Sequence, residues 1–172
     1  MSKNQFDLDG KVAVVGGASR GIGESIAKIL AEYGAHVICA SRRLDACKAV
    51  ADAIAATGGS AEAVECHMGR IEQIEQLFQY VDKNHGRVDV LVNNAAANPY
   101  YGHILDTPVE AFEKTLEVNM RGYFYMCVEA GKRMREQRSG SIINVASVNG
   151  VTPGDKQAVY SMTKAAVINM SR

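Results

Sequence analysis

The sequence lacks several features that would place it in a specialised class of protein. Its formal net charge at pH 7 is +0 over 172 residues, so it has no one-sided basic surface for nucleic acid or anionic lipid. No apolar run approaches the ~20 residues that span a bilayer. Residues 1–11 contain no apolar segment of the kind found in secretory signals. We therefore expect a cytoplasmic protein with no nucleic-acid partner and no membrane partner.

Cysteine pairs are missing as well. The four cysteines are scattered, without a C-x-x-C pair, at Cys39, Cys47, Cys66 and Cys127. Isolated cysteines of this kind usually act as small buried hydrophobic side chains, and free thiols fit a reducing compartment. We expect buried thiols and no metal site.

What the sequence does contain is a regular alternation of short apolar runs and amphipathic stretches. The runs predicted to form strands are residues 11–15, 35–40, 61–66, 88–93 and 140–147. The stretches predicted to form helices are residues 23–34, 44–59, 71–86, 108–119, 121–137 and a last one that starts near Gln157. At the start of the fourth helix, Thr107 and Glu110 predict a capping box.

This alternation predicts the fold class. Strands that alternate with helices of this length favour a parallel sheet with helices on both faces. We predict one doubly wound α/β domain of the Rossmann type over residues 1–172, with strand order 3-2-1-4-5. The order reverses between the first and fourth strands, so a ligand-binding crevice is expected at their carboxyl ends.

The turn after the first strand, GGASRGIG at residues 16–23, is suited to a nucleotide. Glycines at such a turn let the backbone approach a ligand, and the start of the following helix favours a pyrophosphate. The spacing differs from the G-x-G-x-x-G fingerprint. The residues of this turn expected to hold a cofactor are Gly17, Ser19, Arg20, Gly21, Ile22 and Gly23.

The same turn has a second interpretation. Residues 17–21 match G-x-S-x-G, the nucleophile elbow of α/β-hydrolases, in which Ser19 would be the nucleophile. A histidine base would then come from His36, His67, His85 or His103. The elbow also needs an oxyanion-hole loop from an earlier strand, and the sequence has no earlier strand. We therefore favour the nucleotide site.

The end of the second strand indicates which nucleotide is bound. NAD-binding sheets carry an Asp or Glu about 20 residues after the glycine turn, which holds the ribose 2′-hydroxyl. Here Ser41 takes that place and is followed by Arg42 and Arg43. A carboxylate would repel a 2′-phosphate, whereas arginine binds it through charge-assisted hydrogen bonds. With Arg20 nearby, the sequence predicts NADP(H) in preference to NAD(H).

Further motifs, in this order and spacing, make the chain resemble the short-chain dehydrogenase/reductase family. They are NNAA at 93–96, NM at 119–120, Ser147 and YSMTK at 160–164. The strings CHMGR at 66–70 and NAAANPYYGH at 94–103 are similar to an NADPH-dependent carbonyl-reductase branch that includes reductases of retinal and dicarbonyl compounds. The resemblance implies a homotetrameric oxidoreductase that transfers a hydride between a nicotinamide cofactor and a small carbonyl or alcohol substrate.

The resemblance also implies roles for individual residues. Tyr160 gives or takes the proton at the substrate oxygen, and Lys164, one helical turn on, supports it and holds the nicotinamide ribose. Ser147 hydrogen-bonds the substrate oxygen, and Asn119 supports a water that relays protons through the lysine. The other residues implied to contact the cofactor are His67, Met68, Asn94 and Ala95. The substrate is expected to lie near residues 98–101 and 148–157.

Three positions depart from the family pattern. Gly16 stands where the family usually has threonine, and Ala96 replaces a glycine. His67 stands where many members have an aspartate that faces the adenine amino group. An imidazole at that place would accept one hydrogen bond or stack on the base.

The resemblance implies, finally, that family members continue past the last helix with two more strands and another helix. We therefore expect the chain to be incomplete at its C-terminus, with SIINV at 141–145 left as an exposed edge strand. The alternative function is then a nucleotide-binding module without turnover.

Overall fold

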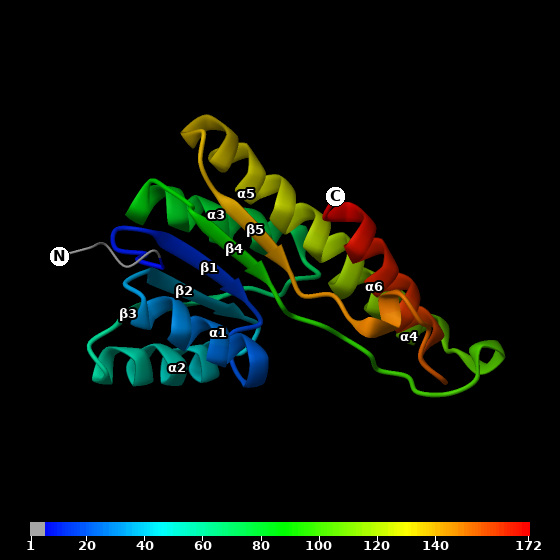
Figure 1. Ribbon diagram of the computed structural model, residues 1–172. Helices are drawn as coiled ribbons and strands as arrows, with labels where there is room; N and C mark the ends of the chain where they lie inside the picture. Colours follow the sequence, from blue (N-terminus) through cyan, green and yellow to red (C-terminus); the bar gives the residue numbers. More distant parts are fainter. Residues whose placement is uncertain (1–5) are drawn as a thin grey trace.

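Five strands form one parallel sheet at the centre of the protein (Figure 1). They are β1 (Val12–Gly16), β2 (His36–Ser41), β3 (Ser60–Glu65), β4 (Val90–Asn93) and β5 (Ser141–Asn144). Their order is β3-β2-β1-β4-β5, which confirms the predicted order. The computed structural model describes residues 6–172. Residues 1–5, part of the stretch in which we expect no secretory signal, lie outside the described residues.

Helices cover both faces of the sheet, as the predicted doubly wound fold requires (Figure 1). Helices α1 (Gly21–Glu32) and α2 (Leu44–Ala56) lie on one face, and α3 (Ile71–His85) and α5 (Tyr123–Gln137) lie on the other. Helices α4 (Val109–Leu116) and α6 (Ala158–Met170) pack against each other. The short helical segments are η1 (Ile104–Asp106), η2 (Glu117–Gly122) and η3 (Val148–Gly150). Within residues 6–172, no helix combines the length and the apolar character that crossing a bilayer requires.

The alternation of side chains along the strands divides the core into two layers. Val14 of β1 packs in one buried cluster with Phe78 of α3. Its neighbour Val15 points to the opposite face and packs in a second cluster with Ala27 of α1. Because both faces are buried, the central strands read as continuous apolar runs rather than as alternating ones.

The segment η2 is a π-helix that joins α4 to α5 without a break. The sequence predicted two separate helices that meet near Asn119. In the structure the flanking residues Leu116 and Tyr123 keep right-handed helical dihedral angles, so the backbone continues through the junction. The wide turn places Val118, Asn119 and Gly122 in the interior. Single π-helical turns of this kind frequently occur at functional sites.

Some element ends differ from the prediction. β5 ends at Asn144 rather than at residue 147, because its partner β4 ends at Asn93, which pairs with Asn144. The predicted capping box is wrong: α4 begins at Val109, its N-cap is Pro108, and no side chain caps it. Proline has no side-chain oxygen that could accept a hydrogen bond from the first turn.

The cysteines are free thiols, and Cys39, Cys47 and Cys66 are buried as predicted. Cys127 is only partly buried. Burial raises the pKa of Cys39 and of Cys66 to about 12, so these thiols stay protonated and act as apolar packing groups.

Candidate functional site

A cavity of about 470 Å³ lies at the carboxyl ends of the strands. Its wall is built from the segments that follow β1, β2, β3 and β4, together with α4 and η2. The residues in the wall are Gly17, Ser19, Arg20, Ser41, Arg42, Arg43, Cys66, His67, Met68, Asn94, Ala95, Ala96, Ala97, Asn98, Pro99, Lys114 and Val118. The cavity therefore lies where the strand order reverses between β1 and β4, which is where open α/β sheets bind ligands.

The glycine turn packs closely against the segment after β4. Gly17 has a φ of +78°, and a Cβ at this position would lie 2.7 Å from the backbone nitrogen of Ala95. A Cβ at Gly23 would lie 2.6 Å from Nδ2 of Asn94, an atom that donates a hydrogen bond to the carbonyl of Gly17 (3.2 Å). Only glycine fits at either position. Because glycine has no side chain, a ligand can approach the backbone of the turn closely.

Helix α1 begins at this turn without a side-chain cap. Its N-cap is Arg20, which makes no capping hydrogen bond. The first backbone N–H groups of the helix therefore need another partner, and a pyrophosphate meets that need. Of the other predicted residues of the turn, Gly21, Ile22 and Gly23 lie outside the cavity wall, and the Ile22 side chain is exposed.

The charge on the cavity wall is positive. Its charged side chains are Arg20, Arg42, Arg43 and Lys114, and the described part of the wall contains no acidic residue. Such a concentration of one charge attracts an anionic ligand.

Two serines position Arg43. Nη2 of Arg43 donates to Oγ of Ser19 (3.3 Å), and Oγ of the buried Ser41 accepts from the Arg43 backbone nitrogen (3.1 Å) and from the Cys47 thiol (3.2 Å). Ser41 therefore fixes the backbone at the end of β2. Arg42 and Arg43, which follow it, are exposed to solvent.

His67 and Met68 reach the cavity in different ways. The Met68 side chain is buried in the core, while His67 forms part of the wall and its Nε2 lies 3.0 Å from Nζ of Lys114. Burial, and then the charge of Lys114, lower the pKa of His67. Its Nδ1 also faces the backbone nitrogen of Gly69 (3.0 Å). A neutral imidazole has one acceptor nitrogen, so His67 accepts from Gly69 or from Lys114, but not from both.

Asn119 connects three parts of the site from its buried place in η2. Its amide Oδ1 accepts from the backbone nitrogen of Ala97 (2.7 Å), and its Nδ2 donates to the Ala97 carbonyl (2.8 Å) and to Oγ1 of Thr163 (3.2 Å). Thr163 in turn donates to the carbonyl of Tyr160 (2.7 Å). The side chain thus links the loop after β4 with α6.

Lys164 is a buried cation with no acidic partner among residues 6–172. Its side chain is 1% exposed, and its Nζ donates to the carbonyl of Val145 (2.6 Å). This nitrogen lies 5.7 Å from the ring centre of Tyr160 and 5.2 Å from that of Tyr123. Burial lowers the pKa of Lys164 to about 8, because a charged form is disfavoured where water is excluded.

Ser147 lies after β5, where it caps η3. Its Oγ accepts from the backbone nitrogen of Asn149 (3.2 Å). In the described chain, no hydrogen bond joins Ser147 to Tyr160, and neither residue is part of the cavity wall. The structure therefore places Asn119, Tyr160 and Lys164 close together, beside the cavity rather than inside it, with Ser147 on a neighbouring loop.

Sequence reasoning missed two residues that hold this arrangement. Thr163 is buried between Asn119 and Tyr160, and Gln157 accepts a hydrogen bond from Asn98 (3.1 Å), which fastens the loop after β4 to the start of α6. The signal that the sequence offered for Thr163 was its polar side chain one position before Lys164. No histidine within residues 6–172 hydrogen-bonds to Ser19, so the structure forms no nucleophile–base pair of the hydrolase type.

A doubly wound parallel sheet with a cavity at its strand-order reversal defines the class of Rossmann-type α/β proteins. Residues 11–172 match the family model described as short chain dehydrogenase. The chain belongs to the short-chain dehydrogenase/reductase family, which is a family of oxidoreductases.

Individual relatives agree with this assignment. The chain is 33% identical to the human dehydrogenase/reductase SDR family member 4 over 165 residues, which are 96% of this chain and 59% of that protein. It is 35% identical to an uncharacterized oxidoreductase of Thermotoga maritima over 167 residues, or 97% and 65% of the two chains. The chain thus spans about three-fifths of the length of the first curated relatives it matches.

Solved structures share the fold closely. A metagenomic short-chain oxidoreductase in complex with NADP is 34% identical, with a TM-score of 0.91 over 95% of this chain and 74% of that one. A short-chain type dehydrogenase/reductase from Mycobacterium marinum is 35% identical, with a TM-score of 0.90 over 96% and 68% of the two chains.

Proposed function

We propose that this protein is an NADP(H)-dependent oxidoreductase that converts a carbonyl compound and its alcohol into one another. The observation that carries the proposal is the charge of the cavity wall, whose charged side chains are Arg20, Arg42, Arg43 and Lys114; of these, Lys114 alone pairs with an acidic side chain of the described residues, Glu117 just outside the wall (3.2 Å). A cofactor with a 2′-phosphate suits this wall better than one with a free 2′-hydroxyl. The solved relative that contains NADP supports the same choice.

Each part of the cofactor has a matching part of the cavity. Arg42 and Arg43 would hold the 2′-phosphate, and the turn at Gly17 with the start of α1 would hold the pyrophosphate. His67 would face the adenine, and residues 94–97 would line the path to the nicotinamide. The nicotinamide supplies or accepts the hydride when it is bound.

The residues beside the cavity are suited to proton transfer. Tyr160 would hold or release the proton at its phenolic oxygen, and Ser147 would hydrogen-bond the substrate oxygen. Lys164 has a pKa of about 8, so it is mostly cationic at neutral pH. This pKa lies about one unit above neutral pH, which suits a group that gives and takes a proton during turnover. Asn119 acts as a positioning residue, because its three hydrogen bonds fix α6 relative to the loop after β4.

A hydrophobic carbonyl compound is the substrate class that fits the surrounding loops. The side chains of Tyr101, Val148 and Val151 are exposed there and offer apolar surface. We also propose a homotetramer in the cytoplasm: Phe124 of α5 and Met162 of α6 leave apolar side chains exposed on the two helices that flank β5, which the family uses for assembly.

One observation favours the alternative, a nucleotide-binding module without turnover. Ser147, Tyr160 and Lys164 all lie outside the cavity wall, whereas the residues suited to the phosphates lie in it. A chain with this arrangement could bind the nucleotide without bringing a substrate to Tyr160.

A titration with NADPH and NADH tests the proposal. A charge-assisted hydrogen bond contributes about 1.5–3 kcal/mol, which corresponds to about a ten- to hundredfold preference for NADPH. Arg42→Ala should remove this preference, while the control Arg135→Ala, an exposed arginine at the end of α5, should keep it.

Turnover is measured in the same cuvette. Loss of NADPH fluorescence after addition of an apolar ketone supports the oxidoreductase, and binding without that loss supports the module. Equal affinities for NADPH and NADH in the unmodified protein would contradict the proposed cofactor.

A further inference from the structure

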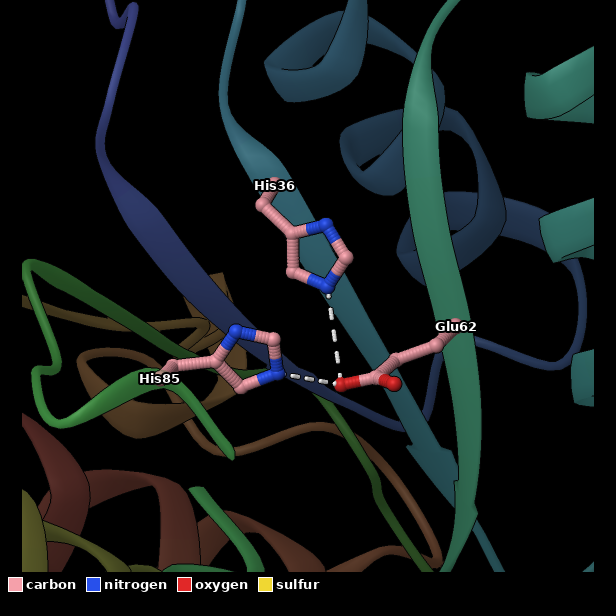
Figure 2. Close-up of side chains that lie close together, drawn as sticks. All are labelled: His36, Glu62 and His85. Atoms are coloured by element: carbon pink, nitrogen blue, oxygen red, sulfur yellow. Dashed lines mark hydrogen bonds and ion pairs between the residues drawn. The ribbon is translucent and has the colours of Figure 1, made fainter. Parts of the chain in front are cut away.

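Three side chains with metal-ligating groups meet at the amino-terminal edge of the sheet, at the opposite ends of the strands from the cavity. They are His36, the first residue of β2; Glu62 in β3; and His85, the last residue of α3. One ligand atom of each lies within 4.8 Å of the other two. Figure 2 shows both imidazole rings directed at the same carboxylate oxygen. We propose that this His–Glu–His cluster binds Zn²⁺.

The distances in the cluster suit one small cation after modest movement of the side chains. Nε2 of His85 lies 2.6 Å from Oε1 of Glu62, and Nε2 of His36 lies 3.5 Å from the same oxygen. Two ligands at ~2.1 Å from a tetrahedral Zn²⁺ are about 3.4 Å apart. The His36–Glu62 distance already has this value, and the metal would have to separate His85 from Glu62 by about 1 Å.

Hydrogen bonds outside the cluster orient the ligands. Nδ1 of His36 lies 2.6 Å from Oγ of Ser60, and a proton on Nδ1 leaves the lone pair of Nε2 facing the cluster. This Nε2 atom is buried and has no hydrogen-bond partner in the described chain. An acceptor lone pair that is buried and unpartnered is what a metal ion would satisfy.

The carboxylate is prepared in the same way. Tyr80 donates its hydroxyl to Oε2 of Glu62 (2.7 Å), which leaves Oε1 for the metal. Glu62 would bind the metal as the carboxylate.

The donor set points to zinc among the common cations. Two imidazole nitrogens and one carboxylate oxygen are typical ligands of Zn²⁺, and the partly exposed side chains leave room for water in the fourth position. Mg²⁺ prefers oxygen ligands in octahedral geometry and would find a single carboxylate here.

The position of the cluster indicates a structural role. β2 runs from His36 to Ser41, so at ~3.3 Å per residue the cluster lies about 16 Å from the cavity. A metal at this place would tie the edge strand β3 to β2 and to the end of α3. It would raise the midpoint of unfolding by binding the folded state and would leave the cofactor site unchanged.

The test uses the whole chain, freed of metal with a chelator and then titrated with ZnCl₂ in a calorimeter. We expect one Zn²⁺ per chain and a higher midpoint of thermal unfolding with Zn²⁺ than with Mg²⁺. His36→Ala and His85→Ala should lose this binding, and Ser60→Ala should weaken it about 10–100-fold. The control His103→Ala changes an exposed histidine outside the cluster and should bind as the unmodified chain does.

Visible and near-ultraviolet absorption of the Co²⁺-loaded chain identifies the type of ligand without relying on a substituted variant. Bands of a tetrahedral site without thiolate charge transfer support the cluster. A thiolate band would place the metal on cysteine and overturn the proposal. The proposal also fails if no Zn²⁺ binds, or if His85→Ala and Ser60→Ala bind it with unchanged affinity.

Discussion

Replacement of Lys164 by methionine should change how the stability of the protein depends on pH. Lys164 is 1% exposed and donates its hydrogen bond to a backbone carbonyl, and no acidic side chain in the described part of the chain pairs with it. Methionine has a similar length and no charge, so Lys164→Met keeps most of the packing and removes the titrating group. The carbonyl of Val145 keeps a donor in the hydroxyl of Tyr123 (3.4 Å).

The sign and size of the effect follow from the pKa of Lys164, which burial lowers from 10.5 to about 8. Below pH 8 the lysine is protonated in both states, and the folded state bears the whole cost of the buried charge. Between pH 8 and 10.5 the unfolded state binds more protons, so the free energy of unfolding rises with pH. The full rise is about 3 kcal/mol, at ~1.4 kcal/mol per pKa unit.

Urea unfolding of both proteins at several pH values from 7 to 10.5 measures this difference. The stability advantage of Lys164→Met over the unmodified protein should be largest at neutral pH and should shrink by about 3 kcal/mol toward pH 10.5. Tyr123, whose pKa burial raises, titrates in both proteins and cancels in the difference. Lys48→Met, on the exposed side of α2, is the matched control. Parallel profiles for Lys164→Met and the unmodified protein would refute the reasoning.

Three further changes test the packing and the site. Gly16→Ala should destabilise the fold by about 1–3 kcal/mol, because its Cβ would lie 2.8 Å from the Met68 side chain; Met68→Ala in the same chain should recover part of the loss, as measured by a double-mutant cycle in urea. Asn119→Ala should cost about 1–3 kcal/mol in urea unfolding by leaving both backbone groups of Ala97 unpaired; an unchanged midpoint would contradict this. Tyr160→Phe should abolish ketone-dependent NADPH oxidation and keep NADPH affinity, and retained turnover would remove Tyr160 from its proposed role.

The fold could be predicted almost completely from the sequence, because its signals are local. Apolar runs of four to six residues between amphipathic stretches are enough to indicate a parallel sheet, and the nearly obligatory crossover hand restricts the strand order. The element ends were harder to predict, because they depend on partners. β5 stops where β4 stops, at the pairing of Asn93 with Asn144, and no property of the residues after Asn144 indicates this end.

Some parts of the candidate site could be predicted from the sequence, and others could not. The glycine turn and Arg42 with Arg43 follow strand ends directly, so topology alone brings them together. The burial of Lys164 and its hydrogen bond to the carbonyl of Val145 depend on how α6 packs. No local sequence pattern indicates this packing. The His–Glu–His cluster was missed because its members lie on three elements and match no spacing motif. The role assigned to each catalytic residue stays a prediction.

Gly16 departs from the family's usual threonine, and the junction at η2 departs from a regular α-helix. The junction has the wider consequence. Every residue of an α-helix turns the chain by about 100°, so α5 keeps its buried face toward the sheet only while η2 has six residues. Loss of one residue would swing Met126 and Ala130 away from the core and move Asn119 away from its hydrogen-bond partners, Ala97 and Thr163. Related chains should therefore vary the residue types of this segment freely at exposed positions, while conserving its length.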